Sequence, residues 1–228
     1  MPTIAPLGDS SLLVLFEPVL DAAVNRRALA VAAALGQRAI AGVRDIVPAY
    51  ASVAVHYDPV RTRLDWLEQA VAAVLEAEPS PDETPRAVEI PCCYDAQYAP
   101  DLAGVAALAR LSAAEVVARH AARSYRVCMI GFLPGFPYLA EVDPAIAVPR
   151  HPTPRLCVAA GSVGLAGRQS GIYPNDSPGG WQIIGRTPVR LFDPDRRPPA
   201  TLSPGDTVRF VPIDSATFQS MAQAGAGG

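Results

Sequence analysis

The chain has 228 residues, half of them apolar, so it can bury a substantial core as one large domain or two small ones. Its formal net charge of −3 gives no sign of attraction to nucleic acid or to an anionic membrane. No apolar run reaches the roughly 18 residues that a membrane span needs, and the first residues lack the basic start and apolar run of a secretory signal. We therefore expect a soluble, cytoplasmic protein with no nucleic-acid or membrane partner.

Lysine is absent, because all 19 basic residues are arginine. This excludes a Walker A lysine, a Schiff-base lysine for pyridoxal phosphate and a biotinyl-lysine on this chain. If ATP takes part in the chemistry, the responsible lysine belongs to a partner. The four cysteines form no C-x-x-C pair and no cluster with the three histidines, so neither a disulfide framework nor a metal site is expected.

Residues 1–78 are predicted to form a small α+β domain. Apolar runs and helical spacing indicate strands at 11–17, 43–50 and 52–58 and helices at 21–38 and 62–76. The expected order is strand, strand, helix, strand, strand, helix, which has one strand more than the three placed above. That order suits a sheet covered on one side by two helices.

Residues 79–85 are expected to be a linker, because their prolines and acidic residues favour neither a helix nor a central strand. The second domain is predicted at 86–214. It opens with a strand at 86–92 and two helical pieces, at 101–110 and 113–123. Ser112 and Glu115 form a capping-box pattern at the second of these pieces.

Glycine and proline are concentrated between residues 131 and 188. A strand at 125–130 comes before this stretch, and the predicted strands within and after it are at 162–168, 181–186, 189–192 and 207–213. Many short strands joined by Gly/Pro turns indicate a β-barrel or a sandwich. Residues 215–228 are expected to be a disordered tail.

The segment GFLPGFPYL, residues 131–139, follows a strand directly. Pro134 and Pro137 each fix one backbone angle, so Phe132, Phe136 and Tyr138 would be presented in fixed directions at little entropic cost on binding. The alternative is a hydrophobic loop that plugs one end of a barrel.

Residues 149–155, PRHPTPR, hold two arginines between prolines, and Arg155 lies just before an apolar run. An arginine stiffened by prolines is suited to bidentate capture of a carboxylate or phosphate, although a solvated surface loop is the alternative. The following glycine-rich run does not match a dinucleotide or phosphate loop. Its Gln169 and Ser170 are candidates for hydrogen bonds to a small ligand.

Two further residues are weaker candidates. Ser177 lies in NDSPGG, which resembles a nucleophile elbow only superficially, because no glycine stands at Asn175 and a strand is expected to follow. A turn that aims Trp181 or exposes backbone amides is the favoured interpretation. His120 is a lone histidine on a helix, for which a satisfied structural role is the default.

The segments GFLPGFPYL, PRHPTPR, GSVGLAGRQSGIYP and SPGGWQIIGRTP, followed by LFDP and PGDTVRF, resemble one known family. They are similar to the B subunit of 5-oxoprolinase, whose family includes allophanate hydrolase subunit 1 and a Kip-type inhibitor of a sporulation histidine kinase. The resemblance extends from the Gly8-Asp9-Ser10 turn over essentially the whole chain.

The resemblance implies an α+β N-terminal domain followed by a mainly-β, cyclophilin-like barrel. It also implies two partners, the A and C subunits, with which such a chain hydrolyses 5-oxo-L-proline to glutamate at the expense of ATP. The ATP site would lie on a partner subunit, with no metal or covalent cofactor on this chain. Regulation of a histidine kinase, a carboxyltransferase-like role in urea degradation and stand-alone prolyl isomerisation remain alternatives.

For such a substrate the residues suggest a division of roles. Phe136 and Trp181 would pack the ring. Its carboxylate and amide would be held by Arg155, Gln169 and the backbone amides near Gly179 and Gly180. Additional candidates for the site are Ser170, His120, Pro134, Ser177 and Arg186.

Overall fold

The computed structural model describes residues 2–79 and 85–226 and divides the chain into two compact units, Met1–Thr84 and Pro85–Gly228. The linker expected at 79–85 lies almost entirely outside the described residues. Within these residues, no helix is both long enough and apolar enough to cross a membrane.

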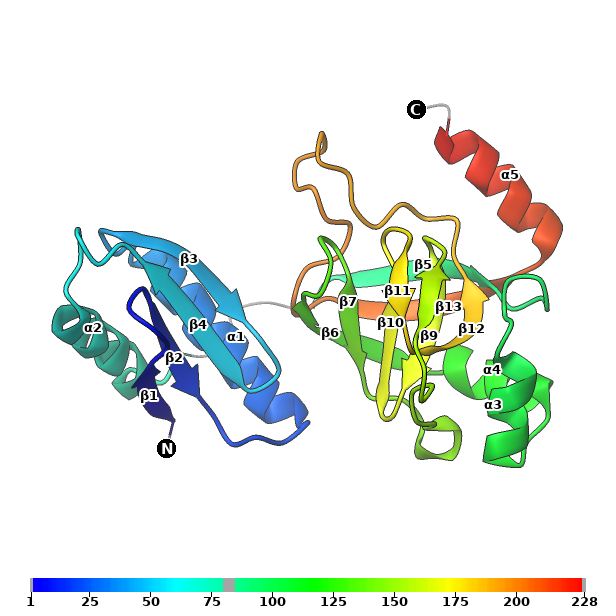
Figure 1. Cartoon of the computed structure of the whole chain (residues 1–228), viewed down its shortest axis with the longest axis horizontal. Coiled ribbons are helices and arrows are strands. Elements are labelled where there is room, and N and C mark those ends of the chain that lie inside the picture. The colour runs from blue at the N-terminus through cyan, green and yellow to red at the C-terminus, as the bar shows by residue number, and fades with distance from the viewer. Residues whose placement is uncertain (1, 80–84, 227–228) are drawn as a thin grey trace. The chain divides into compact units, whose positions relative to one another are not determined.

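The first unit is a four-stranded antiparallel sheet with two helices (Figure 1). Its strands lie in the order β1-β2-β4-β3. The elements follow one another as β1 (Thr3–Pro6), β2 (Ser11–Leu15), α1 (Ala22–Gln37), β3 (Val43–Pro48), β4 (Ser52–Tyr57) and α2 (Leu64–Glu76).

One face of this sheet is buried, as the alternation along residues 52–58 predicts. Val53, Val55 and Tyr57 are buried, whereas the residues between them are half-buried. The same apolar core contains Leu35 of α1 and Val71 of α2, so both helices cover this face. Asp21 caps the beginning of helix α1, because its carboxylate accepts hydrogen bonds from the N–H groups of two residues in the first turn.

The second unit is built on a closed, mixed β-barrel of seven strands. The strands lie in the order β10-β7-β6-β13-β5-β12-β9, and only the β13–β5 pair is parallel. The barrel strands are β5 (Ala87–Cys93), β6 (Ser124–Ile130), β7 (Pro137–Ala140), β9 (Ser162–Ala166), β10 (Gln169–Ile172), β12 (Gln182–Arg186) and β13 (Thr207–Ile213).

Further elements surround the barrel (Figure 1). They are the helices α3 (Leu102–Ala109), α4 (Ala113–Ala121) and α5 (Ser215–Ala226), the 3-10 turn η1 (Pro144–Ile146), and a two-stranded sheet of β8 (Arg155–Val158) and β11 (Ser177–Gly179). The predicted capping box of α4 is confirmed. The Ser112 hydroxyl accepts from the Glu115 N–H, and the Glu115 carboxylate accepts from the Ser112 N–H.

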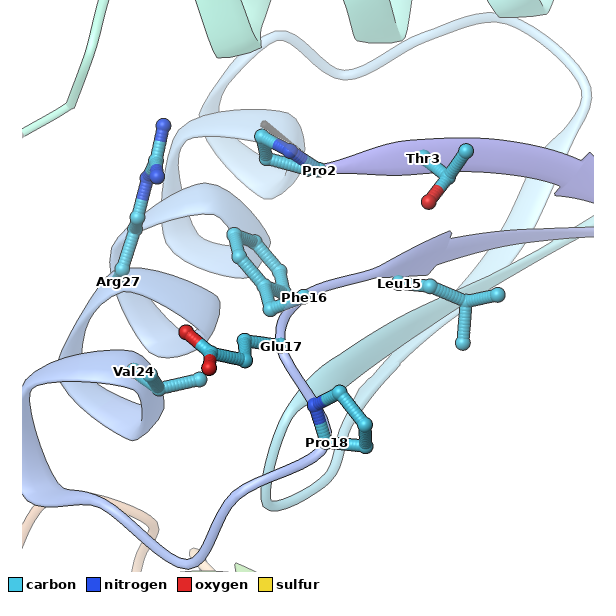
Figure 2. A pocket seen from close by; sticks show the side chains of 8 residues that line it. All are labelled: Pro2, Thr3, Leu15, Phe16, Glu17, Pro18, Val24 and Arg27. Carbon is cyan, nitrogen blue, oxygen red and sulfur yellow. The ribbon is translucent and has the colours of Figure 1, made fainter.

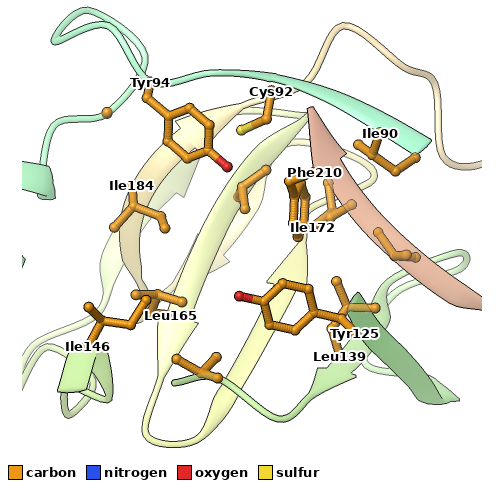
Figure 3. Close-up of a cluster of buried hydrophobic side chains, with 14 of the residues drawn as sticks. Ile90, Cys92, Tyr94, Tyr125, Leu139, Ile146, Leu165, Ile172, Ile184 and Phe210 are labelled. Atoms are coloured by element: carbon orange, nitrogen blue, oxygen red, sulfur yellow. The ribbon is translucent and has the colours of Figure 1, made fainter. Parts of the chain in front are cut away.

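The barrel interior is filled by large apolar side chains from every strand, among them Ile90, Leu165, Ile184 and Phe210 (Figure 3). His120 of α4 is fully buried among them, with its ring stacked on Phe210.

The polar atoms of His120 are satisfied by the chain itself. Its Nδ1 lies 2.8 Å from the Tyr94 hydroxyl, and its Nε2 lies 3.2 Å from Ser170 Oγ. The Ser170 hydroxyl donates its hydrogen to the Gly164 carbonyl, so it accepts from His120 Nε2. Nε2 therefore carries the ring hydrogen, and Nδ1 accepts from the Tyr94 hydroxyl. The default expectation of a structural histidine therefore fits this geometry.

Two local predictions were wrong. The tail expected to be disordered at 215–228 forms helix α5 over Ser215–Ala226, because Phe218 packs on Tyr98 at 4.2 Å between ring centroids. The strand expected at 189–192 is reduced to one isolated bridge, Phe192 with Ala200. Conversely, β7 and β10 were not predicted, because their glycines and prolines obscure the alternation of a strand.

The stability of the second unit is expected to fall on acidification in a way that depends on His120. Burial lowers the pKa of His120 to about 3, from 6.5 when it is free. Between these values the unfolded chain binds a proton that the folded chain does not, so the free energy of unfolding falls by up to about 1.4 kcal/mol per pH unit. Urea unfolding between about pH 7.5 and about pH 5, followed by Trp181 fluorescence in a Trp66→Phe background, measures this slope.

A His120→Gln variant provides the comparison for this slope. It removes the titrating group and retains hydrogen-bonding capacity, so it should be less stable at neutral pH and lose less stability on acidification. His56 and His151 are unchanged in both proteins. Equal slopes in the two proteins would contradict the buried, neutral histidine.

Candidate functional site

A second apolar layer lies on the outer face of the barrel wall formed by β7, β10, β9 and β12. It is separate from the barrel core and contains Phe136, Tyr138, Tyr173 and Trp181, hereafter the aromatic cluster, together with Val158 and Ile183. Phe136 is its centre, with ring centroids 4.9 to 5.5 Å from those of the other three. Edge-on packing of this kind fixes each ring by its neighbours.

Glycines in the strands make room for these rings. Added at Gly171 of β10, a Cβ atom would lie 2.9 Å from ring atoms of both Phe136 and Trp181; at Gly164 of β9, it would lie 3.0 Å from the Cβ of Trp181. The glycine-rich run of the sequence thus permits close approach of aromatic rings to the strand backbone, as expected for glycine inside a strand.

The loop between β6 and β7 holds one aromatic ring in solvent. Phe132 is 62% exposed and has a φ of 68°, a left-handed conformation that costs a bulky residue about 1–3 kcal/mol. Its ring meets Phe136 edge-on at 5.6 Å. Gly135, with a φ of 81°, provides the turn, and a Cβ there would collide with Phe192.

Arg155 is anchored beside the aromatic cluster by a buried acid. Its Nη2 lies 2.5 Å from Asp101 Oδ1, and the Ile183 N–H donates to Oδ2 of the same carboxylate. Burial alone would raise the pKa of Asp101, but these hydrogen bonds hold it below its usual value. Arg155 Nη1 is buried with no hydrogen-bond partner among the described residues, and His151 Nε2 lies 3.3 Å from Asp101 Oδ2.

A second arginine of the same loop, Arg150, lies over the outer ring of the aromatic cluster. Its Cζ is 5.6 Å from the Trp181 ring centroid. Burial raises the pKa values of Tyr138 and Tyr173, and the charge of Arg150 opposes both shifts. The guanidinium is therefore close enough to act on both phenols.

The structure brings five of the predicted site residues to this face. Phe136 and Trp181 are in the aromatic cluster, and Arg155, Gly179 and Gly180 adjoin it. A Cβ on Gly179 would collide with the Tyr173 hydroxyl, and the Gly180 carbonyl accepts from the His151 N–H at 2.7 Å.

Four other predicted residues are not part of the aromatic cluster. Gln169 is half-buried on the outer side of β10, two residues before Gly171, and Pro134 is exposed in the loop that carries Phe132. Ser170 and His120 face the barrel interior and bind each other, so neither reaches solvent in this structure.

Ser177 and Arg186 make local contacts. The Ser177 hydroxyl donates to the Pro178 carbonyl, and no hydrogen bond links it to a histidine among the described residues. Arg186 donates to the Ala160 carbonyl and lies over Phe218 of α5.

Sequence reasoning missed three residues of this face. Arg150 fits a solvated loop when only its sequence neighbours are considered, and it carries no sign of the ring that it covers. Tyr173 and Asp101 lie in no motif with recognisable chemistry. No pattern in the sequence signals that Asp101 meets Arg155.

The first unit contains surface hollows. One of about 440 Å³ is lined by Phe16, Glu17, Val24 and Arg27 with four neighbours, and Figure 2 shows the Arg27 and Glu17 side chains near the Phe16 ring. Its polar groups are exposed at the surface, so it is a weaker candidate than the aromatic cluster. No group of three or more potential metal ligands occurs among residues 2–79 and 85–226.

Comparison with known proteins gives a consistent result. Residues 2–202 match the family described as carboxyltransferase domain, subdomain C and D. The chain is 39% identical over 229 residues to the 5-oxoprolinase B subunit of Bacillus subtilis, covering 95% of each chain. It is 40% identical over 207 residues to the 5-oxoprolinase B subunit of Escherichia coli O157:H7, covering 90% of this chain and 94% of the relative.

Solved structures with the same fold include longer chains. The crystal structure of the protein TTHA0988 aligns with a TM-score of 0.80 and 42% identity over 90% of this chain, which spans 40% of that protein. Urea carboxylase of Kluyveromyces lactis aligns with a TM-score of 0.79 over 97% of this chain and 22% of its own length. At 20% identity this second likeness shows the fold alone.

Replacing Gly171 with alanine is expected to destabilise the second unit by about 1–3 kcal/mol, because the new methyl group would overlap two buried rings. Urea unfolding followed by Trp181 fluorescence in the Trp66→Phe background measures the change.

The matched control is Gly104→Ala in α3, where a new Cβ meets nothing within 4 Å. That variant should gain about 0.5–1 kcal/mol from the higher helix propensity of alanine. If both alanine variants were equally stable, the close packing assigned to Gly171 would be wrong.

Proposed function

We propose that this chain, which belongs to the carboxyltransferase subdomain C and D family, is the B subunit of an ATP-dependent 5-oxoprolinase. The observation that carries the proposal is its identity of about 40% over nearly the full length of two relatives named as 5-oxoprolinase B subunits. The reaction opens the lactam of 5-oxo-L-proline. Water adds to the ring carbonyl, the C–N bond breaks, and the ring nitrogen becomes the amino group of L-glutamate.

The proposed complex is cytoplasmic and contains the A and C subunits as partners. The word "subunit" in the names of the relatives supports the presence of partners. Opening an unstrained five-membered lactam is unfavourable, so coupling to ATP makes chemical sense. Because the chain has no lysine and no phosphate loop, we place the ATP site on a partner.

The second unit would contribute one wall of the substrate site. We interpret the closed seven-stranded barrel as the cyclophilin-like barrel implied by the family resemblance. Phe136 and Trp181 are only 1% and 5% exposed in this structure, so they would shape this wall from beneath rather than pack the ring directly, and Arg155 has an unpaired buried nitrogen beside them. Gln169 and the backbone near Gly179 and Gly180 would supply the remaining polar contacts.

The alternatives receive less support. A role in urea degradation rests here on a likeness to urea carboxylase at 20% identity, which shows the fold alone. Regulation of a histidine kinase and prolyl isomerisation draw on no specific observation in the barrel, and a fold by itself does not determine function.

The proposal is tested by co-expressing the chain with candidate A and C subunits and measuring glutamate release from 5-oxo-L-proline. We expect release that requires ATP and all three subunits, with none from this chain alone. Omission of each subunit in turn is the control. Turnover of urea or allophanate by the complex, without glutamate release, would contradict the proposal and assign a different activity of the same family.

A further inference from the structure

Arg150 is an uncompensated cation at the edge of the aromatic cluster. No carboxylate lies within ion-pair distance of it in the part of the chain that the structure describes. By contrast, the charge of its neighbour Arg155 is balanced by Asp101 at 2.5 Å. A negatively charged group arriving at this face therefore meets an unpaired positive charge, that of Arg150.

The backbone on both sides of Arg150 is fixed. The carbonyl of Pro149 accepts from Nε2 of the buried Gln182 at 3.1 Å, and the His151 N–H donates to the Gly180 carbonyl at 2.7 Å. These two anchors flank Trp181 in the sequence. Arg150 is thus held from both sides by the segment that carries the ring on which its guanidinium lies.

A guanidinium that lies over an indole ring directs its N–H donors within its own plane, so they are not used up by the ring. It can then offer two parallel N–H groups to a carboxylate, and stacking reduces the entropy lost when it does so. The Tyr138 and Tyr173 phenols lie within the field of the same charge. Arg150 thus places one charged group at the edge of the buried aromatic cluster.

We propose that Arg150 binds the carboxylate of a small, flat ring substrate, with Trp181 as its platform and Gln182 as a positioning residue. Arg155, whose charge is already balanced, holds Asp101 and the β8 strand in place instead. The identity of the substrate as 5-oxoproline rests on the proposed function. The carboxylate selectivity of the subsite rests on the geometry alone.

The test uses the reconstituted complex and two probes that differ only in the carboxylate. These are 5-oxo-L-proline, for which KM is measured, and 2-pyrrolidinone, for which the inhibition constant is measured. Arg150→Gln should raise KM by about 10- to 100-fold, the range for a lost hydrogen bond to a charged group, and leave the inhibition constant of 2-pyrrolidinone unchanged. Arg150→Lys retains the positive charge but loses the paired N–H donors of the guanidinium. Its KM for 5-oxo-L-proline should lie between those of the unchanged protein and of Arg150→Gln.

Arg190→Gln is the matched control, because this exposed arginine is paired with Asp193 and lies outside the aromatic cluster. It should leave both constants unchanged. Gln182→Ala should raise KM in the same sense as Arg150→Gln and by less. If Arg150→Gln weakens both probes equally, or neither, the assignment is wrong.

A second measurement separates this inference from the proposed function. In the Trp66→Phe chain, Trp181 is the remaining tryptophan, so its fluorescence reports directly on the platform. Should the complex fail to hydrolyse 5-oxoproline, the chain is titrated with ring carboxylates and their uncharged amides. A fluorescence change with carboxylates that Arg150→Gln abolishes supports the subsite; the absence of any carboxylate-specific change refutes it.

Discussion

The second unit depends on a barrel wall that is buried on both faces. Strands β9, β10 and β12 are almost continuously buried, because their inner side chains fill the barrel and their outer side is covered by the aromatic cluster. The outer side of such a wall cannot hold a large side chain at every position, because the aromatic rings must lie against the strand backbone. Gly164 and Gly171 leave the backbone bare where Phe136 and Trp181 lie on it. The position of each ring is therefore determined by the strands beneath it, and the site is as rigid as the barrel.

The same constraint explains what could be predicted from the sequence. In the first unit the two helices and strands β2, β3 and β4 carry regular apolar periodicity, as do the strands at both ends of the second unit, and they form close to where that periodicity places them; β1 was not placed. Between residues 131 and 188 the periodicity is broken. Gly171 stands where an outward side chain would mark a strand, and Pro137 begins β7 without resembling one. The glycine content that disguised these strands is what the aromatic cluster requires.

The site residues were predictable only where a motif carried them. Phe136 and Trp181 lie in long, distinctive segments. Ser170 lies in one too, yet the alternation of β10 turns its hydroxyl inward to His120. Asp101 and Arg155 meet across 54 residues of sequence through a contact that no local pattern reveals. Pairing of this kind requires the three-dimensional fold, and it decides which arginine keeps a free charge.

The exposed side of the aromatic cluster gives a reason for a second subunit. Arg150 is solvent-exposed on Trp181, and Phe132 stands 62% exposed in a conformation that costs energy to hold. In water, an arginine–carboxylate contact at an open surface contributes little, because solvent screens the charges. Covering the same contact with another protein surface removes that screening and strengthens the attraction several-fold. In the proposed complex, a wall with a free cation and an exposed ring would therefore gain substrate affinity chiefly when a partner closes over it.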